Sequence, residues 1–389
     1  MKIFHCVESY FPSVGGMQEV VKQLSERMVL LGHEVIVLTR FHPNRTSDCI
    51  RGVKVVDFKI EGNPFSATTP EEKRYVDYLL GLNGDIITFF AAQQWATNLA
   101  LDILPQLKPK KVSVPTGYSG LYKEEYNDYF QKMRTWIHSY DLNVYLSDDY
   151  RDSNFAKACG VQKRIVIPNG ASVDEFAQDP GISIREKYNI PKNHKILLHL
   201  GSYTGRKGHK ELLSLFLKSK LTNCTLLMIG NEIDIFKNRS LFKFPFLLLQ
   251  LLISKLGSRK VIFTEADRKT TVSAYFQSDL FIFPSQIECS PIVLFESAAA
   301  GLPFFATDVG NAIEIAKWTG AGEIMATIRD NNGFSFPDYP KAISQLEGLL
   351  FDNKKLNEMS VAGRRNWIEH FTWESIALRY AEEYKKLLE

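Results

Sequence analysis

The chain has 389 residues, of which 45% are hydrophobic and 23% are charged, and its formal net charge at pH 7 is +3. At ~100–200 residues per domain, this length favours two domains over one. The small net charge, without an arginine-rich run or a basic tail, gives no support for nucleic-acid binding. We therefore expect a globular protein whose basic sites are local.

The cysteines and the apolar runs indicate the compartment. Five cysteines are spread singly and form no Cys-x-x-Cys pair, which favours reduced thiols in the cytoplasm and argues against a zinc site. Residues 1–8 read as a strand rather than as a signal peptide. The longest apolar run, Leu241–Ile253, is too interrupted to reach the ~18 residues that a membrane-spanning helix needs. It is either a core helix or a peripheral contact with the inner face of the cell membrane, because basic residues accompany it.

The first half of the chain begins with a strand–helix–strand unit. An apolar strand, Lys2–Val7, leads through a loop to Gly15 and Gly16 and then to a helix with apolar residues on one face. Gly32 is placed to end that helix, and a second strand follows at Glu34–Thr39. This order is typical of a parallel sheet.

The second half repeats this plan. A strand at Lys195–Gly201 is followed by a glycine-containing loop, a helix from about His209 and a strand at Thr225–Gly230. Further strands alternate with helical stretches, as a doubly wound sheet requires, and they are expected at residues 261–263, 280–283 and 303–307. The sequence therefore predicts an α/β protein with two similar domains.

Turn-forming residues without a sustained period occupy residues 167–183, so the connection between the domains is expected there. We place the first domain at residues 1–175 and the second at 176–373. The remaining segment, residues 374–389, is amphipathic, with Ile376, Tyr380 and Tyr384 on one face. It predicts a docking helix.

Ligands of open parallel sheets bind beyond the carboxyl ends of the strands, so two such domains facing each other would enclose a cleft. The loops that follow strands are therefore the candidate sites. Gly15 and Gly16 precede a helix, where the missing Cβ atoms let a bulky group approach the backbone N–H donors. A tight turn is the alternative explanation. The pair forms neither the G-x-G-x-x-G pattern nor a P-loop, which weakens dinucleotide and nucleotide-triphosphatase interpretations.

A basic pair follows the strand at Lys195–Gly201. Arg206 and Lys207 lie at the beginning of a helix, where backbone N–H groups, the helix dipole and two cations together favour phosphate. A solvated basic turn is the alternative, because both residue types are common in exposed loops.

The stretch Phe283–Asn311 places two glutamates around another helix start. Ser290 is a candidate N-cap and Pro291 a candidate first residue of a helix, whose free N–H groups would hold an anion such as a diphosphate. Glu288 precedes those donors and Glu296 lies about one and a half turns inside the helix. Carboxylates repel phosphate but accept hydrogen bonds from hydroxyls, so we expect both to bind sugar hydroxyls. Alternatively, the two glutamates are a solvated loop residue and a helix-surface residue.

These residues carry a resemblance to a known family. "FPSQIECSPIVLFESAAAGLPFFATDVGN" is similar to the characteristic segment of the retaining glycosyltransferases of family 4, with two glutamates separated by seven residues, an A-x-G-x-P run and a glycine loop. The whole chain resembles that family, which has the GT-B architecture of two Rossmann-like domains facing across a cleft. Further matches are Phe11–Thr39, Ile167–Gly170, Arg206–Gly208 and Phe371–Glu374.

The resemblance implies roles for individual residues. Glu288 would contact the transferred sugar, Glu296 the nucleotide ribose, and the basic pair the donor diphosphate, while the final helix would dock back onto the first domain. Glu288, Lys207 and Arg206 are thus the candidate catalytic residues. The expected nucleotide-sugar-binding residues are Gly15, Gly16, Ser202, Arg206, Lys207, Glu288, Ser290, Pro291, Ile292 and Glu296.

The chain departs from the family at two places. The family often has arginine directly after the strand, where this chain has Ser202, so Arg206 is the candidate for the second cation. The family's histidine near the transferred sugar is absent from "GDIITFFAAQQWATN" and from "VPTGYSG". Gln93 and Thr116 are the candidates to replace it, and Asn169 is a further candidate sugar or acceptor contact.

We therefore expect a retaining glycosyltransferase that moves a sugar from a UDP- or GDP-sugar to a hydroxyl of a saccharide or lipid-linked acceptor, in polysaccharide or lipopolysaccharide assembly. We expect no cofactor, and no metal, because no two aspartates form an Asp-x-Asp pair. One alternative is a hydrolase or phosphorylase that uses Glu288 and Glu296 as acid and nucleophile. Another is a non-catalytic protein that binds sugar nucleotides, which fold alone does not exclude.

Overall fold

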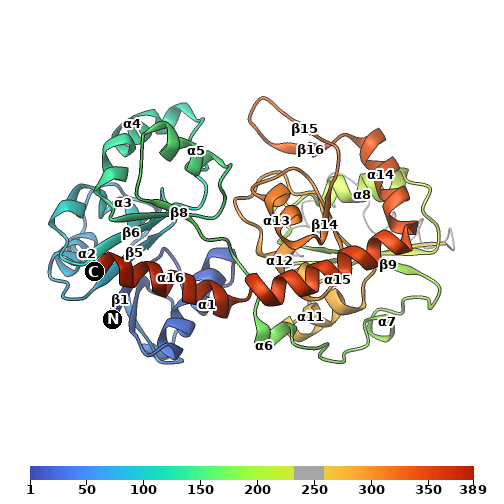
Figure 1. Cartoon of the computed structure of the whole chain (residues 1–389), viewed down its shortest axis with the longest axis horizontal. Helices are drawn as coiled ribbons and strands as arrows, with labels where there is room; N and C mark the ends of the chain where they lie inside the picture. Colours follow the sequence, from blue (N-terminus) through green and yellow to red (C-terminus); the bar gives the residue numbers. More distant parts are fainter. Residues whose placement is uncertain (232–257) are drawn as a thin grey trace. The chain divides into compact units, whose positions relative to one another are not determined.

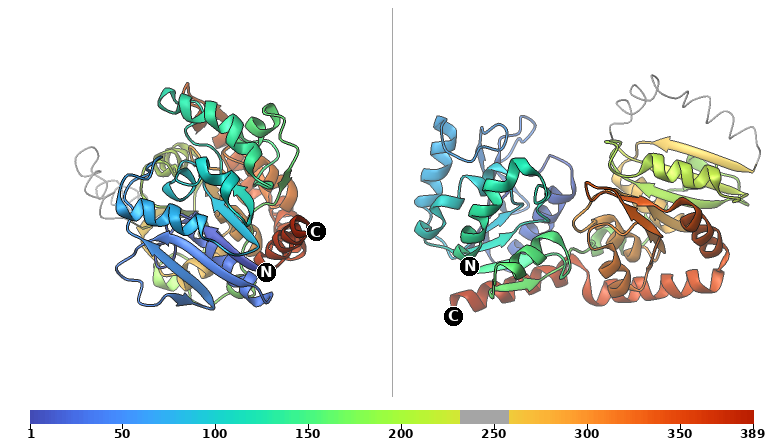
Figure 2. Two further views of the ribbon diagram at one scale, coloured as in Figure 1. Left: turned by 90° about the vertical axis from the view of Figure 1, so that its left-hand side faces the viewer. Right: turned by 90° about the horizontal axis from the view of Figure 1, so that it is seen from above.

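The computed structural model describes residues 1–231 and 258–389, which form two compact units (Figure 1). The first comprises residues 1–169 together with 373–389, and the second comprises residues 170–372. The chain therefore passes from the first unit to the second after Asn169. The sequence placed this boundary after residue 175. Each unit contains a parallel sheet with helices packed against it, as Figure 2 also shows. The segment Leu241–Ile253, for which a membrane contact was one expectation, lies outside the described residues.

The sheet of the first unit has eight strands in the order β3-β4-β2-β1-β5-β6-β7-β8. All neighbours are parallel except β3 and β4, which are antiparallel. The chain order reverses between β1 and β5, and such a reversal leaves a crevice at the carboxyl ends of the strands. The strands are β1 Lys2–Cys6, β2 Glu34–Arg40, β3 Cys49–Ile50, β4 Val53–Phe58, β5 Ile86–Phe90, β6 Lys110–Val114, β7 Leu142–Tyr145 and β8 Arg164–Val166.

The helices of the first unit begin and end where local chemistry dictates. The second helix starts with a capping box, in which Thr69 and Glu72 satisfy each other's backbone N–H groups. The first helix ends before Gly32, whose φ of +83° favours glycine. The helices are α1 Gly16–Leu30, α2 Pro70–Leu80, α3 Trp95–Asn98, α4 Asn127–Trp136, α5 Arg151–Ala158 and α16 Trp373–Leu388, with 3₁₀ turns η1 Leu101–Gln106, η2 Glu124–Tyr126 and η3 Ile137–Ser139.

The last helix, α16, packs against α1, although Arg27 on α1 and Glu374 on α16 are 347 positions apart in the sequence. A side-chain ion pair joins Arg27 to Glu374 at 2.7 Å. The hydroxyl groups of Tyr384 and Thr88 lie 2.7 Å apart in the interior. Ile376, Tyr380 and Tyr384, which the sequence placed on one face, are buried. The end of the chain thus completes the core of the first unit.

The sheet of the second unit has six parallel strands in the order β11-β10-β9-β12-β13-β14. Here the chain order reverses between β9 and β12, which are neighbours. A separate antiparallel pair, β15 and β16, lies outside this sheet. The strands are β9 Lys195–Leu200, β10 Cys224–Ile229, β11 Arg259–Thr264, β12 Leu280–Phe283, β13 Phe304–Ala306, β14 Gly322–Ile324, β15 Thr327–Arg329 and β16 Ser335–Pro337.

Both faces of this sheet are buried, which explains why its strands are almost continuously apolar. Leu198 on β9 packs into the cluster on one face, whereas its neighbour Leu197 packs into the cluster on the other. The covering helices are α6 Val173–Phe176, α7 Ile184–Lys187, α8 His209–Lys218, α11 Arg268–Gln277, α12 Ile292–Ala299, α13 Ala312–Thr319, α14 Tyr339–Phe351 and α15 Asn353–His370. No helix within residues 1–231 and 258–389 has the length and apolar character to cross a bilayer.

Candidate functional site

In the second unit, two loops meet at the carboxyl ends of β9 and β12, where the strand order reverses. The backbone N–H of Gln286 donates to the carbonyl of Arg206 at 2.9 Å, and Ser285 Oγ lies 3.2 Å from the same carbonyl oxygen. Gly208 has a φ of +78°, and a Cβ there would overlap the carbonyl oxygen of Pro284. Only glycine therefore allows the two loops to approach this closely.

An ion pair joins these loops. Lys207 Nζ lies 2.7 Å from Glu288 Oε1, and the Ser285 hydroxyl donates to the same carboxylate oxygen at 2.8 Å. The Lys207 side chain is 33% exposed and that of Glu288 is 13% exposed, so the pair has one face toward solvent. Both residues were predicted for the site. Their direct contact places a cation and an oriented carboxylate side by side at the crevice.

Arg206 is exposed and has a different partner from Lys207. Its guanidinium carbon lies 4.1 Å from the centre of the Phe334 ring, which directly precedes β16. Stacking on an aromatic face orients a guanidinium without neutralising it. Ser202, the remaining predicted residue of this loop, is the second residue after β9 and lies four positions before Arg206.

The helix after β12 begins one residue later than predicted. Pro291, with φ −70° and ψ 112°, occupies the N-cap position, and Ile292 is the first residue of α12. Ser290 is therefore not the N-cap. Its hydroxyl accepts a hydrogen bond from the Asn311 side chain at 3.2 Å, which fastens it to the loop before α13. The start of α12 still lies in the same loop as Glu288.

Glu296 lies about one turn inside α12 and is 7% exposed. Arg268, at the start of α11, donates to Oε1 of Glu296, and the Tyr275 hydroxyl donates to Oε2 at 2.9 Å. The same guanidinium binds Glu175 through two hydrogen bonds of 2.9 and 2.7 Å. The sequence reasoning missed Arg268, because no local pattern links it to a glutamate 28 positions further on. Glu296 is thus held in one orientation and keeps lone pairs to accept from hydroxyl groups.

Two buried histidines support the loop that carries Lys207. The rings of His199 on β9 and His209 on α8 lie 4.7 Å apart, edge to face. Burial lowers the pKa of His199 to about 4 and that of His209 to about 2. Both imidazoles are therefore neutral near pH 7, and the positive charge of this region comes from Lys207 and Arg206.

In the first unit, Gly15 and Gly16 lie at the start of α1, after β1. Gly15 has extended backbone, with φ 171°, and a Cβ there would meet only the flexible side chain of Gln18. The fold of this unit therefore does not itself require glycine at residue 15. Ligand contact at this pair stays a prediction.

The loops after β5 and β6 carry the candidate sugar contacts and are unusually strained. Gln93 and Thr116 have φ values of 63° and 57°, and Ala91 and Tyr118 are also left-handed. Non-glycine residues in this region cost of order 1–3 kcal/mol each and concentrate at functional sites. The side-chain oxygen of Gln93 accepts from Gly120 N at 3.1 Å, so it holds the two loops together. Asn169, the third candidate, is buried at the end of the unit.

The chain matches two family descriptions over adjoining segments. Residues 14–175 match "Glycosyltransferase Family 4", and residues 182–366 match "Glycosyl transferases group 1". The chain belongs to the family 4 glycosyltransferases. Sugar transfer is thus the activity that its family supports.

Curated relatives of this glycosyltransferase cover most of its length. The lipopolysaccharide glucosyltransferase WaaG of Escherichia coli is 24% identical over 84% of this chain and 85% of its own. The GDP-mannose:cellobiosyl-diphosphopolyprenol alpha-mannosyltransferase of Xanthomonas campestris is 23% identical over 100% of this chain and 97% of its own.

Solved structures show the same fold. Sucrose-phosphate synthase from Thermosynechococcus elongatus aligns with a TM-score of 0.76 at 18% identity, over 100% of this chain and 99% of its own. HepE from Anabaena in complex with UDP-glucose aligns with a TM-score of 0.71 at 16% identity, over 99% of this chain and 100% of its own. The predicted GT-B fold, with parallel sheets in two domains, is therefore confirmed.

Proposed function

We propose that this glycosyltransferase transfers a sugar from a nucleoside diphosphate sugar to an acceptor hydroxyl with retention of configuration. The observation that carries the proposal is the Lys207–Glu288 ion pair of 2.7 Å at the point where the sheet order reverses. Open α/β sheets bind their ligands at such points. A cation for phosphate and an acceptor for sugar hydroxyls lie there together.

The cations would stabilise the leaving diphosphate. As the bond to the anomeric carbon breaks, that carbon becomes oxocarbenium-like and negative charge accumulates on the diphosphate. Groups already oriented toward the developing charge supply the largest share of such catalysis. Lys207, Arg206 and the first N–H groups of α12 would take this role, with α12 beginning at Ile292 after Ser290 and the N-cap Pro291.

The two glutamates would hold hydroxyl groups on either side of the diphosphate. Glu296, fixed by Arg268 and Tyr275, is suited to bind the ribose, whose position changes little during the reaction. Glu288 would bind the transferred sugar, and its contact with Lys207 sets the orientation of its carboxylate.

We also propose that transfer needs neither a metal nor a cofactor, since Lys207, Arg206 and the α12 start would neutralise the diphosphate. The donor would be a UDP- or GDP-sugar. Support for these two nucleotides comes from the names of similar proteins, one bound to UDP-glucose and one using GDP-mannose.

The acceptor would be a lipid-linked or cell-surface saccharide in polysaccharide or lipopolysaccharide assembly. The names of two relatives, one acting on lipopolysaccharide and one on a diphosphopolyprenol-linked cellobiosyl unit, support this class. We propose a cytoplasmic location, because the five cysteines are spread singly along the chain without a Cys-x-x-Cys pair. A peripheral contact with the inner face of the cell membrane through Leu241–Ile253 would give sedimentation with acidic liposomes at low salt, and its absence would exclude that contact.

A transfer assay tests the proposal. A thermal-shift screen of UDP- and GDP-sugars identifies the donor, and nuclear magnetic resonance of the product with saccharide acceptors then gives its anomeric configuration. An α-linked donor should yield an α-linked product. Free sugar or sugar phosphate as the main product in the presence of acceptor would instead indicate a hydrolase or phosphorylase. Donor binding with neither transfer nor slow hydrolysis would indicate a non-catalytic binding protein.

A further inference from the structure

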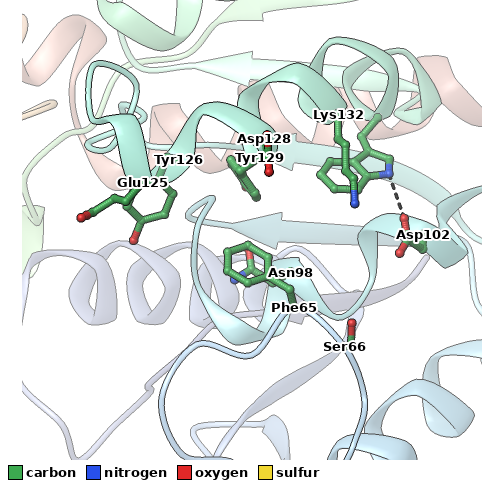
Figure 3. Close-up of a pocket in the computed structure, with 10 residues that line it drawn as sticks. Phe65, Ser66, Asn98, Asp102, Glu125, Tyr126, Asp128, Tyr129 and Lys132 are labelled. Carbon is green, nitrogen blue, oxygen red and sulfur yellow. Dashed lines mark hydrogen bonds between the residues drawn. The ribbon is translucent and has the colours of Figure 1, made fainter.

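A cavity of about 460 Å³ lies entirely within the first unit (Figure 3). Its walls come from the loop that follows β4, from α3 and η1, and from η2 and α4. This volume falls within the ~300–1,000 Å³ typical of small-ligand sites. None of the site residues described above lines it.

Aromatic rings form much of the cavity wall. Phe65 and Tyr129 have ring centres 5.5 Å apart at 61°, and Tyr126 follows with its ring centre 6.2 Å from that of Tyr129. Figure 3 shows the side chains of Tyr126, Tyr129 and Phe65 near one another in the cavity wall. Phe65 is 48% exposed, although an apolar side chain of this size gains free energy from burial. Such rings offer flat faces on which the C–H surface of a sugar can stack.

A buried amide in the wall needs a hydrogen-bond donor. Asn98 is only 2% exposed and lines the cavity. Its side-chain nitrogen donates to the carbonyl of Asn63 at 3.4 Å, whereas its Oδ1 accepts no hydrogen bond from any residue in the described ranges. A buried acceptor without a partner costs roughly 1–3 kcal/mol, so a hydroxyl group bound in the cavity would offset that cost.

The charges of the wall exclude anionic ligands. Asp102, Glu125 and Asp128 contribute three carboxylates and Lys132 one ammonium group, while Glu125 is paired with Lys123 at 3.5 Å, so Asp102 and Asp128 outweigh Lys132. Asp102 is held in place, because the Trp136 ring nitrogen donates to it at 3.1 Å. Phosphate or carboxylate groups would be repelled here, whereas neutral hydroxyl groups would find several acceptors.

The cavity is linked to the strained loop after β5. The hydroxyl of Tyr129 accepts a hydrogen bond from the backbone N–H of Gln93 at 3.2 Å. Gln93 lies just beyond the carboxyl end of β5, which borders the reversal of strand order in the first sheet. A ligand that contacts Tyr129 therefore lies next to a candidate sugar-contacting loop.

We propose that this cavity binds a neutral sugar residue of the saccharide acceptor, stacked on Phe65 and Tyr126 with a hydroxyl group donating to Asn98 Oδ1. That the bound saccharide is the acceptor rests on the proposed transfer reaction. Binding of the sugar itself rests only on the cavity. The cavity thereby discriminates against anionic sugars at this position.

Direct binding to the whole protein, without any nucleotide sugar, tests the proposal. The probes are methyl α-glucoside, methyl α-mannoside, maltose and cellobiose, with glucuronate and glucose 6-phosphate as anionic counterparts, titrated by saturation-transfer difference spectroscopy. At least one neutral probe should bind, and the anionic probes should bind more weakly. Phe65→Ala should weaken that binding roughly 2- to 10-fold, the size of one lost aromatic contact. Asp128→Asn should reduce the difference in affinity between the neutral and the anionic probes.

The control is Phe41→Ala, which removes a ring of similar exposure, 43%, from the same unit but outside the cavity. It should bind the probes as the unaltered protein does. The proposal is overturned if no neutral probe binds, if Phe65→Ala leaves binding unchanged, or if the anionic probes bind as tightly. Self-association of the protein that is lost in Phe65→Ala would assign the surface to a second copy and would also overturn it.

Kinetics separates this proposal from the proposed function. With a transferring donor and acceptor, Phe65→Ala should raise the KM for the acceptor roughly 2- to 10-fold and leave that for the donor unchanged. Transfer with an unaltered acceptor KM in Phe65→Ala would contradict acceptor binding in the cavity but not the proposed transfer reaction. Phe65-dependent probe binding without transfer from any nucleotide sugar would contradict the transfer reaction but not sugar binding in the cavity.

Discussion

Lys207 Nζ and Glu288 Oε1 lie 2.7 Å apart and join two loops whose strands, β9 and β12, are neighbours at the reversal of the sheet. If the pair works as a unit, removing either partner also disables the other. Lys207→Ala and Glu288→Ala should therefore be strongly non-additive in kcat/KM, with a coupling of roughly 0.5–3 kcal/mol. A double-mutant cycle on transfer measures it. Independent effects, whose free energies add within error, would show that the contact has no role in the reaction.

The two glutamates should differ in which kinetic step they affect. Glu296→Ala should weaken UDP or GDP binding, because the ribose is held equally in the ground and transition states. Glu288→Ala should mainly slow turnover, because the transferred sugar changes during the reaction. Calorimetric titration with the nucleoside diphosphate, together with kcat, distinguishes them. Equal losses of nucleotide affinity in the two variants would count against these assignments.

Gly208 should be essential for the geometry of the site. Its φ is +78° and a Cβ would overlap the Pro284 carbonyl, so Gly208→Ala must push the two loops apart. We expect a loss of transfer activity of at least about tenfold, since small misplacements of reacting groups cost up to ~10²-fold in rate. Gly205→Ala is the matched control, because Gly205 has a φ of +89° in the same loop but open space around its Cβ position. Equal activity losses in both variants would show that backbone conformation, not loop contact, matters.

Buried histidines should make the second unit sensitive to acid. Burial lowers the pKa of His199 from 6.5 to about 4 in the folded state. The unfolded chain therefore binds a proton near pH 6.5 that the folded protein does not accept until about pH 4, and the free energy of unfolding falls as the pH falls through that interval. His199→Gln should reduce this pH slope by up to about 1.4 kcal/mol per pH unit, as measured by urea unfolding between pH 7 and pH 4.5.

Exposed His138 provides the control for that experiment. His138→Gln removes an imidazole from the surface of the first unit and leaves the buried histidines of the second unit in place. An unchanged slope in His199→Gln would mean that this histidine does not set the acid sensitivity.

The strands β1 and β2 of the first sheet and β9 to β13 of the second could be predicted from sequence, because they read as apolar runs between turn residues. The strand at Leu280–Phe283 matches the expected residues at both ends. The predicted start of α12 was one residue too early. Proline is found at both the N-cap and the first helical position, and only the observed ψ of 112° shows that Pro291 is the N-cap.

Contacts between distant residues could not be predicted. Arg268 reaches Glu296, and Phe334 stacks on Arg206, through folding that brings separate loops together. The cavity beside Phe65 is equally hidden, because its wall combines five segments whose separate sequences contain only ordinary aromatic and polar residues.

The most direct test of the account is the turnover of Lys207→Ala at saturating donor in the presence of excess EDTA. If Lys207, Arg206 and the start of α12 supply the positive charge that the leaving diphosphate needs, the unaltered enzyme keeps its activity in EDTA. Lys207→Ala should then lose roughly 10²–10³ in kcat with little change in donor affinity, and magnesium should not restore it. Unchanged turnover in Lys207→Ala, or an unaltered enzyme that EDTA silences and magnesium or manganese restores, would contradict the account.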